Sequence, residues 1–231
     1  RVEKIHVQNL EEDKIVLLRH MMIGSLLGRI QAIYSSGFEM KEMVPMLIEA
    51  IDLSSLSWSG NRKFIGSEGV ELDQYSLGTY DEMLWMLSLG YLLGISTEDF
   101  EKLVNIIDED GIKDKLFEFI ISTKIRTRSL LGQESYKNGW KLFGKLREAI
   151  GAKDKAQAES LIKGFLEKDW YKEHKNVGWY DNHKGKHDTY SGYWCFESGA
   201  IVAIMDLDDS SFRDNEYYPK DLVDYYRENK D

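Results

Sequence analysis

Three histidines in the C-terminal third of the chain offer the clearest metal-ligand chemistry in the sequence. His183 and His187 are four residues apart, and His174 lies a short distance upstream. Zinc binds imidazole and carboxylate groups in a tetrahedral array, and an HxxxH spacing on a helix can supply two ligands. A glycine separates the two histidines and no glutamate follows the first, so the zinc-protease motif is absent. The favoured interpretation is loop histidines that pack on Trp179 and Tyr180, and a metal-dependent hydrolase is the alternative.

Nucleophilic chemistry has weaker support. A catalytic thiol needs an exposed thiolate beside a base, whereas Cys195 lies in an apolar stretch and is expected in the core. The sequence also lacks a nucleophile elbow, a phosphate-cradling glycine loop and a dinucleotide fingerprint. It therefore predicts a protein that is not an enzyme and that needs no cofactor.

Charge and hydropathy limit the partners and the compartment. The chain has 231 residues, 40 of them acidic and 30 basic, which gives a net charge of −10. Direct binding to nucleic acid normally requires a basic footprint, so this balance argues against it. No apolar run approaches the roughly 20 residues of a membrane span, and no basic-then-apolar signal segment opens the chain. A single cysteine fits a reducing compartment. We expect a cytoplasmic protein without a membrane partner.

The spacing of apolar residues predicts helices along most of the chain. The first helix is long, carries one apolar stripe and ends near Gly37, since glycine readily closes a helix. This stripe consists of Ile15, Leu18, Met22, Leu26, Ile30 and Ile33. A second helix either begins or kinks at Pro45. Loops are expected at 54–74 and 170–188. Further helices are expected at about 80–93, from Ser96 or Thr97 to Gly111, and from Leu116 onward. The remaining helices are expected at 135–150, 153–168 and 190–205, and a short helix is expected after Pro219.

These elements predict an all-α fold, a multi-helix globular bundle with little or no β structure. A faint internal repeat aligns Trp85 with Trp194 and brings Gly90 onto Gly199. It suggests two helical halves, 1–95 and 96–231, that meet in one compact unit.

The most specific pattern lies near the C-terminus. It consists of GYW-x-FE at 192–197, DDSSF at 208–212 and YYPxDL at 217–222. In this order the three segments resemble the C-terminal domain of PoNi-like immunity proteins. The long first helix with AIYSSG at 32–37 extends the similarity to most of the chain. One departure is Ser198-Gly199, which stands where a small apolar residue is expected.

The resemblance implies a non-enzymatic helical protein that protects its own cell during interbacterial competition. Its partner would be a PoNe-type DNase toxin, which it would neutralise by stoichiometric binding, as in other toxin–immunity pairs. A general helical scaffold unrelated to toxins is a further alternative.

Four motif residues are expected on neighbouring turns of one helix: Tyr190, Tyr193, Trp194 and Glu197. Tyr193 and Glu197 would then face the same side, because they are four residues apart. Glu197 is expected to accept a hydrogen bond from a tyrosine hydroxyl or a loop amide. This bond would orient the aromatic loop, which is the loop expected at 170–188.

Acidic residues cluster after this helix and are expected to cap its end. A nuclease must hold phosphates, so its cleft is basic and complementary to an acidic surface. The candidate toxin contacts are Asp206, Asp208, Asp209, Asp214 and Glu216. The alternative is an ordinary solvated helix end.

Overall fold

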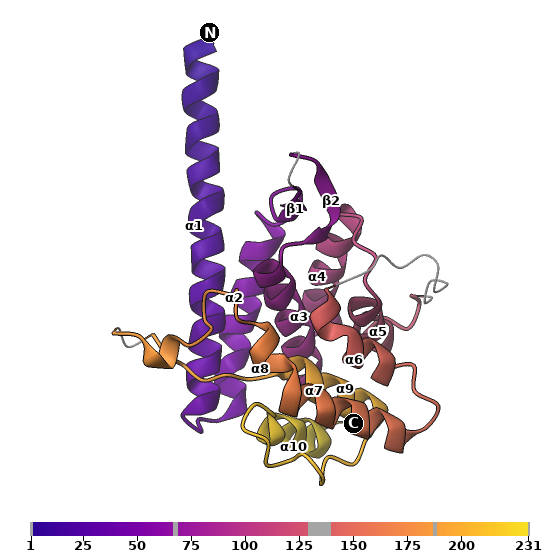
Figure 1. Ribbon diagram of the computed structural model, residues 1–231. Helices are drawn as coiled ribbons and strands as arrows, with labels where there is room; N and C mark the ends of the chain where they lie inside the picture. Colours follow the sequence, from indigo (N-terminus) through magenta and orange to yellow (C-terminus); the bar gives the residue numbers. More distant parts are fainter. Residues whose placement is uncertain (1, 67–68, 129–139, 187–188, 231) are drawn as a thin grey trace.

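The computed structural model describes residues 2–66, 69–128, 140–186 and 189–230, and these residues form a predominantly helical protein (Figure 1). The expected all-α fold is confirmed, with one small two-stranded sheet. The elements in chain order are α1 (Val2–Ser35), η1 (Met40–Met43), α2 (Val44–Ser55), β1 (Lys63–Ile65), β2 (Glu71–Tyr75), α3 (Leu77–Leu92), α4 (Thr97–Glu109), α5 (Lys115–Lys124), η3 (Lys141–Phe143), α6 (Gly144–Ala149), α7 (Lys155–Lys168), α8 (Trp170–Glu173), η4 (Asn182–Lys184), α9 (Phe196–Met205) and α10 (Lys220–Asn229). Among the described residues, none of the helices combines the length and apolar composition that a bilayer crossing requires.

Helices α3 and α9 form the centre of the protein. Each is apolar around most of its circumference, and a helix of this kind must be covered on all sides. Helix α3 packs against α9, α5, α4, α10 and α2. The described residues on both sides of position 95 therefore share one hydrophobic core. The division into halves at 1–95 and 96–231 stays a prediction.

Helix ends follow local chemistry. Helix α1 ends before Gly37, which has a φ of 71°, and Pro45 lies in the first turn of α2. The Ser96 side chain accepts a hydrogen bond from the amide of Asp99, which caps α4. Asp206 closes α9 in the left-handed conformation, as expected for the start of the acidic segment.

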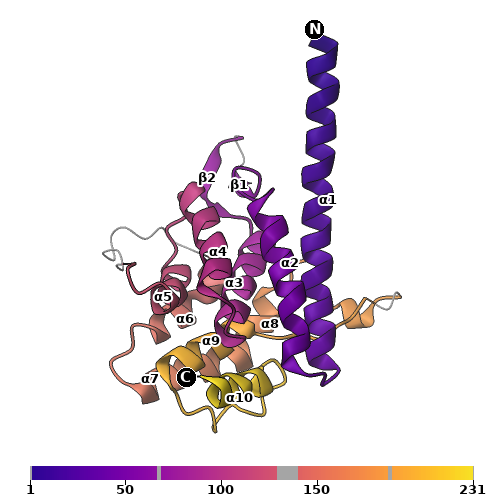
Figure 2. The same cartoon turned by 180° about the vertical axis from the view of Figure 1, so that it is seen from behind.

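The first helix departs from its expected packing. Leu26 and Ile30 are buried, whereas Ile15, Leu18 and Met22 are 45%, 58% and 46% exposed. The reason is that the N-terminal half of α1 extends past the body of the protein, as two opposite views show (Figures 1 and 2). The stripe is therefore buried only where α1 reaches the core.

The expected loop at 54–74 was wrong in part. Helix α2 continues to Ser55, and β1 and β2 pair as an antiparallel hairpin. Contacts from distant segments hold the second strand. The buried Tyr75 hydroxyl donates to Asp110 (2.7 Å), and the Trp140 indole donates to the Tyr75 carbonyl (3.0 Å).

Two expected helices are shorter than predicted. Of the helix at 135–150, residues 135–139 lie outside the described part of the chain, and the rest forms η3 and α6. The helix at 190–205 begins only at Phe196. Gly192 has a φ of 105°, which helix geometry excludes, and the Cys195 amide donates to the Tyr217 carbonyl (2.8 Å) instead of to its own helix. The repeat thus pairs helical Trp85 with non-helical Trp194.

Gly199 permits the closest helix approach in the centre. A Cβ atom there would lie 2.8 Å from Pro219 Cγ and 3.2 Å from Val223 Cγ2. Gly199→Ala should therefore lower the free energy of unfolding by about 1–3 kcal/mol, since overpacked cores cost this much. Gly28→Ala is the control, because no atom lies within 4 Å of a Cβ there and alanine favours helix. Urea unfolding of both variants tests the packing, and equal stabilities would contradict it.

Candidate functional site

Glu197 is a buried carboxylate at the start of α9. It is 1% exposed, and the Trp170 indole donates to its Oε1 atom at 2.7 Å. Its Oε2 atom has no hydrogen-bond partner among the described residues. Burial raises the pKa of Glu197 to about 7. The carboxylate ties the aromatic loop to α9, but its donor is an indole and not the expected tyrosine or amide.

Glu197 and Trp170 belong to a buried polar centre that also includes His174 and Asp81. His174 connects this centre to α3. Its Nε2 atom lies 3.4 Å from Oδ1 of Asp81, and its Nδ1 atom contacts the Trp170 carbonyl. Burial alone would lower the pKa of His174, but the hydrogen bond and charge of Asp81, the Trp170 carbonyl and the charge of Glu197 together raise it. Asp81, His174, Trp170 and Glu197 therefore link α3, α8 and α9 in the interior.

Aromatic rings hold the segment that follows α8. The Trp170 and Trp179 rings stack at 5.5 Å, and Tyr171 stacks on Tyr217 at 5.3 Å with an interplanar angle of 7°. Tyr193 packs on Trp179 at 5.5 Å. The aromatic loop is thus fixed both to the polar centre and to the C-terminal segment.

The motif residues do not share one helix, so the expected common face of Tyr193 and Glu197 was wrong. Residues 190–195 run outside α9. Tyr190 is 52% exposed, whereas Tyr193 is buried and donates its hydroxyl to Asn182 at 2.8 Å. The Trp194 indole donates to the Ser35 hydroxyl at 2.7 Å, which attaches this segment to the end of α1.

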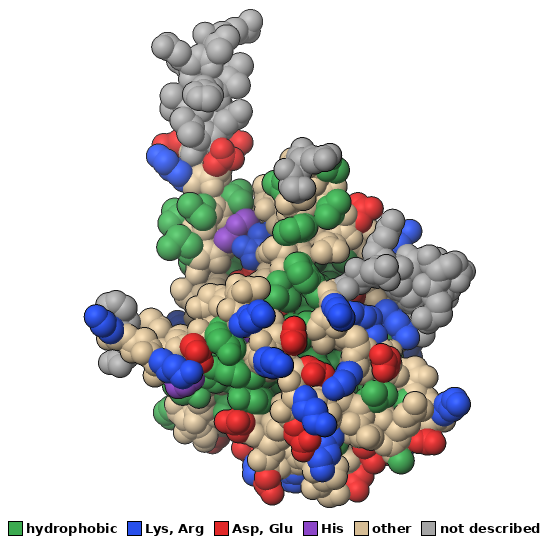
Figure 3. Space-filling view, viewed as in Figure 1, with side chains coloured by type: hydrophobic (Ala, Val, Ile, Leu, Met, Phe, Trp, Pro, Cys, Tyr) green, Lys and Arg blue, Asp and Glu red, His purple; other side chains and the backbone are tan. Residues whose placement is uncertain are grey.

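Four of the five expected toxin contacts are surface carboxylates. Asp208 accepts hydrogen bonds from the amide and hydroxyl of Ser210, and Asp214 and Glu216 are exposed. Two of these carboxylates form salt bridges with lysines: Lys155 lies 3.2 Å from Asp206, and Lys220 lies 3.2 Å from Asp214. Figure 3 shows carboxylates interspersed with lysines and arginines around this end of the body.

Asp209 differs from the expected surface contact because it is buried. It is 5% exposed and accepts hydrogen bonds from Tyr218 (2.9 Å), Arg213 (3.1 Å) and Arg227 (3.1 Å). A buried carboxylate needs such partners, since an unpaired charge is costly in the interior. Asp209 therefore holds the C-terminal segment to α10.

Of the three histidines of the alternative metal site, the structure describes two, and these two contact different partners. His174 is in the interior, His183 bonds to the Tyr193 hydroxyl, and His187 lies outside the described residues. Within the ranges that the structure describes, no group of three or more histidine, cysteine, aspartate or glutamate side chains is placed to hold a metal. Cys195 is buried as expected, although it precedes α9.

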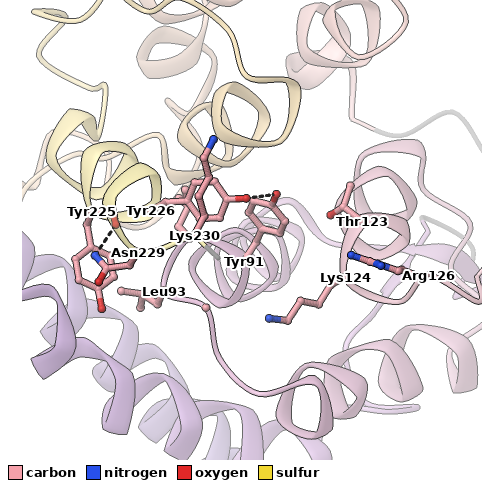
Figure 4. Close-up of a pocket in the computed structure, with 11 residues that line it drawn as sticks. Tyr91, Leu93, Thr123, Lys124, Arg126, Tyr225, Tyr226, Asn229 and Lys230 are labelled. Carbon is pink, nitrogen blue, oxygen red and sulfur yellow. Dashed lines mark hydrogen bonds between the residues drawn. The ribbon is translucent and has the colours of Figure 1, made fainter.

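A basic pocket of about 590 Å³ lies where α3, α5 and α10 end (Figure 4). Lys124, Arg126 and Lys230 line it, and the hydroxyls of Tyr91 and Tyr226 share a hydrogen bond of 2.6 Å. Burial lowers the pKa of Lys124. Cations at helix C-termini complement the helix dipole, so these residues have a structural role without any ligand. Sequence reasoning missed the pocket because its walls come from three distant segments.

The fold and these features define an all-helical protein with a buried polar centre beneath a charged C-terminal segment. Residues 112–222 match the family profile described as PoNe immunity proteins (PoNi), C-terminal. No curated protein matched the sequence. The fold is similar to that of protein PA2201 from Pseudomonas aeruginosa, with a TM-score of 0.54 and 19% sequence identity over 92% of this chain and 78% of that one.

Replacing Glu197 by glutamine should change how stability depends on pH. The folded protein binds the Glu197 proton more tightly than the unfolded chain, whose pKa is near 4.5. The stabilisation from this group is complete below about pH 4.5 and is lost as pH rises through about 7. Across this window, the wild-type protein should lose up to roughly 3 kcal/mol of unfolding free energy relative to Glu197→Gln.

Urea unfolding at a series of pH values measures this difference. His174 is present in both proteins, and its titration differs between them only through its coupling to the charge of Glu197. The exposed Glu216→Gln variant is the control and should follow the wild-type curve. Parallel curves for the wild type and Glu197→Gln would rule out a raised pKa at Glu197.

Proposed function

We propose that this protein is an immunity protein that binds a cognate bacterial DNase toxin of the PoNe type and neutralises it by forming a stoichiometric complex in the cytoplasm. The observation that carries the proposal is the family match over residues 112–222. That segment contains the polar centre residues His174 and Glu197 and all five acidic candidates. The toxin class, the compartment and the non-catalytic mode of action are parts of the proposal.

The proposed interface is centred on the exposed carboxylates of the C-terminal segment, namely Asp206, Asp208, Asp214 and Glu216. Asp209 supports them from below, since its bonds to Arg213 and Arg227 fix the backbone between α9 and α10. Opposite charge raises the encounter rate with a basic cleft and selects the partner, while buried anchors determine the lifetime of the complex. Because neighbouring lysines offset part of the local charge, attraction depends also on the net charge of −10.

The proposed halves, 1–95 and 96–231, would act as one unit in this role. Helix α3 of the first half packs on α9 of the second half, and the acidic segment directly follows α9 in the sequence. The first half would therefore support the binding surface without having to contact the toxin there.

Charge reversal at the interface should slow association with the toxin. In Asp214→Lys/Glu216→Lys, two exposed carboxylates become ammonium groups. We expect the association rate constant to fall by about tenfold, with a weaker dependence on salt, because long-range steering is lost. Stopped-flow or surface-binding kinetics with the purified DNase at several salt concentrations measure both quantities.

Glu101→Lys/Glu109→Lys is the matched control. It changes the net charge equally, but both residues are exposed on α4. This control should slow association much less. Equal slowing by both double variants would exclude the C-terminal segment as the contact, and the absence of any complex with the wild-type protein would refute the proposed function.

A further inference from the structure

The N-terminal half of α1 carries an apolar stripe that nothing in the described structure covers. Ile15, Leu18 and Met22 are 45%, 58% and 46% exposed, and Leu17 and Met21 beside them are 59% and 62% exposed. Single exposed apolar residues are common on protein surfaces, but a contiguous group of this size typically marks an interaction site.

The stripe has the spacing of a coiled-coil seam. Steps of four and three residues connect its members in order: Glu11, Ile15, Leu18, Met22, Ser25 and Arg29. Residues at such spacing stay on one face of a helix and pack against a second helix. All six side chains are exposed. At 1.5 Å per residue the seam is about 27 Å long.

The stripe cannot turn toward the rest of the chain. The other side of α1 is attached to the body, because Arg19 donates to the Leu56 carbonyl (3.1 Å) and His20 contacts the Ser57 carbonyl (3.0 Å). Further along, Ile23 and Ile30 are fully buried against the core. The seam therefore stays exposed on the side of α1 that does not contact the body, and the N-terminal part of the helix projects past the body (Figures 1 and 2).

The charges at the two ends of the seam identify the kind of partner. Glu11 lies at one end and Arg29 at the other, with apolar residues between them. In an antiparallel pair of identical helices that cross near position 20, Glu11 of each chain faces Arg29 of the other, and Leu18 faces Met22. The same two-fold axis makes every favourable contact occur twice.

We propose that the protein forms a homodimer through antiparallel pairing of the α1 seam. This inference is independent of the proposed toxin and concerns a surface far along the chain from the acidic segment. Ser25, a small residue near the C-terminal end of the seam, allows the projecting half of the partner helix to lie close.

Sedimentation velocity of the full chain over a wide concentration range tests the dimer. The wild-type protein should sediment as a dimer at the higher concentrations, and Leu18→Glu/Met22→Glu should remain a monomer. Ile65→Glu/Val70→Glu is the matched control, because these hairpin residues are 65% and 57% exposed but lie off the seam. It should still dimerise. Circular dichroism melting verifies that each variant is folded.

A charge swap tests the antiparallel register. Glu11→Arg or Arg29→Glu alone should raise the dimer dissociation constant by about tenfold, since each replaces two opposite-charge pairs by two like-charge pairs. The combination of both changes should restore the wild-type value. A wild-type protein that stays monomeric, a seam variant that still dimerises, or a swap that fails to restore affinity would overturn the proposal.

Discussion

The arrangement of the C-terminal half depends on the burial of one carboxylate. Glu197 lies in the first turn of the central helix α9, and its only hydrogen bond from another described residue comes from the Trp170 indole. A carboxylate in this position requires a donor, because an unpaired polar group in the core costs more than most single contacts contribute. This hydrogen bond fixes the position of Trp170. The Trp170 carbonyl in turn contacts His174, which bonds to Asp81 on α3. Segments that are far apart in sequence are thereby held in one position.

This constraint reaches the surface through backbone and aromatic contacts. Tyr171 follows Trp170 and stacks on Tyr217, and the amide of Cys195 bonds to the carbonyl of that same tyrosine. The chain between α9 and α10 is consequently held from both sides, with Asp209 as its internal anchor. The acidic residues of α9 and the segment after it therefore fall into two groups. Glu197 and Asp209 are buried and hydrogen-bonded within the fold, whereas Asp206, Asp208, Asp214 and Glu216 are exposed, with Lys155 beside Asp206 and Lys220 beside Asp214.

The sequence was sufficient to predict the helices whose apolar spacing and end signals are local. Gly37, Pro45 and Ser96 mark helix ends where they were expected, because a turn or a cap depends on neighbouring atoms. The same spacing could not predict the start of α9, since a bond between Cys195 and Tyr217 competes with helix formation there. The hairpin was missed for a similar reason, because Asp110 and Trp140 stabilise it from a distance.

Burial was harder to predict than helicity. The apolar stripe of α1 continues beyond the point where the core ends, so its first members are exposed although their pattern is that of a buried face. Among the candidate contacts, nothing in the sequence separates Asp209 from Asp208, because only the fold brings two arginines and a tyrosine to one of them. The histidine spacing was also uninformative, since His174 and His183 bind different partners.

We propose that the protein acts by occupying the surface of a nuclease and not by chemistry of its own. Titration of DNA cleavage by a purified DNase of the proposed PoNe type tests this most directly. DNA cleavage should fall in proportion to the protein added and disappear at equimolar ratio, with both proteins recovered intact as a complex. Full cleavage in the presence of a large excess of the folded protein, or inhibition at strongly substoichiometric amounts, would contradict it.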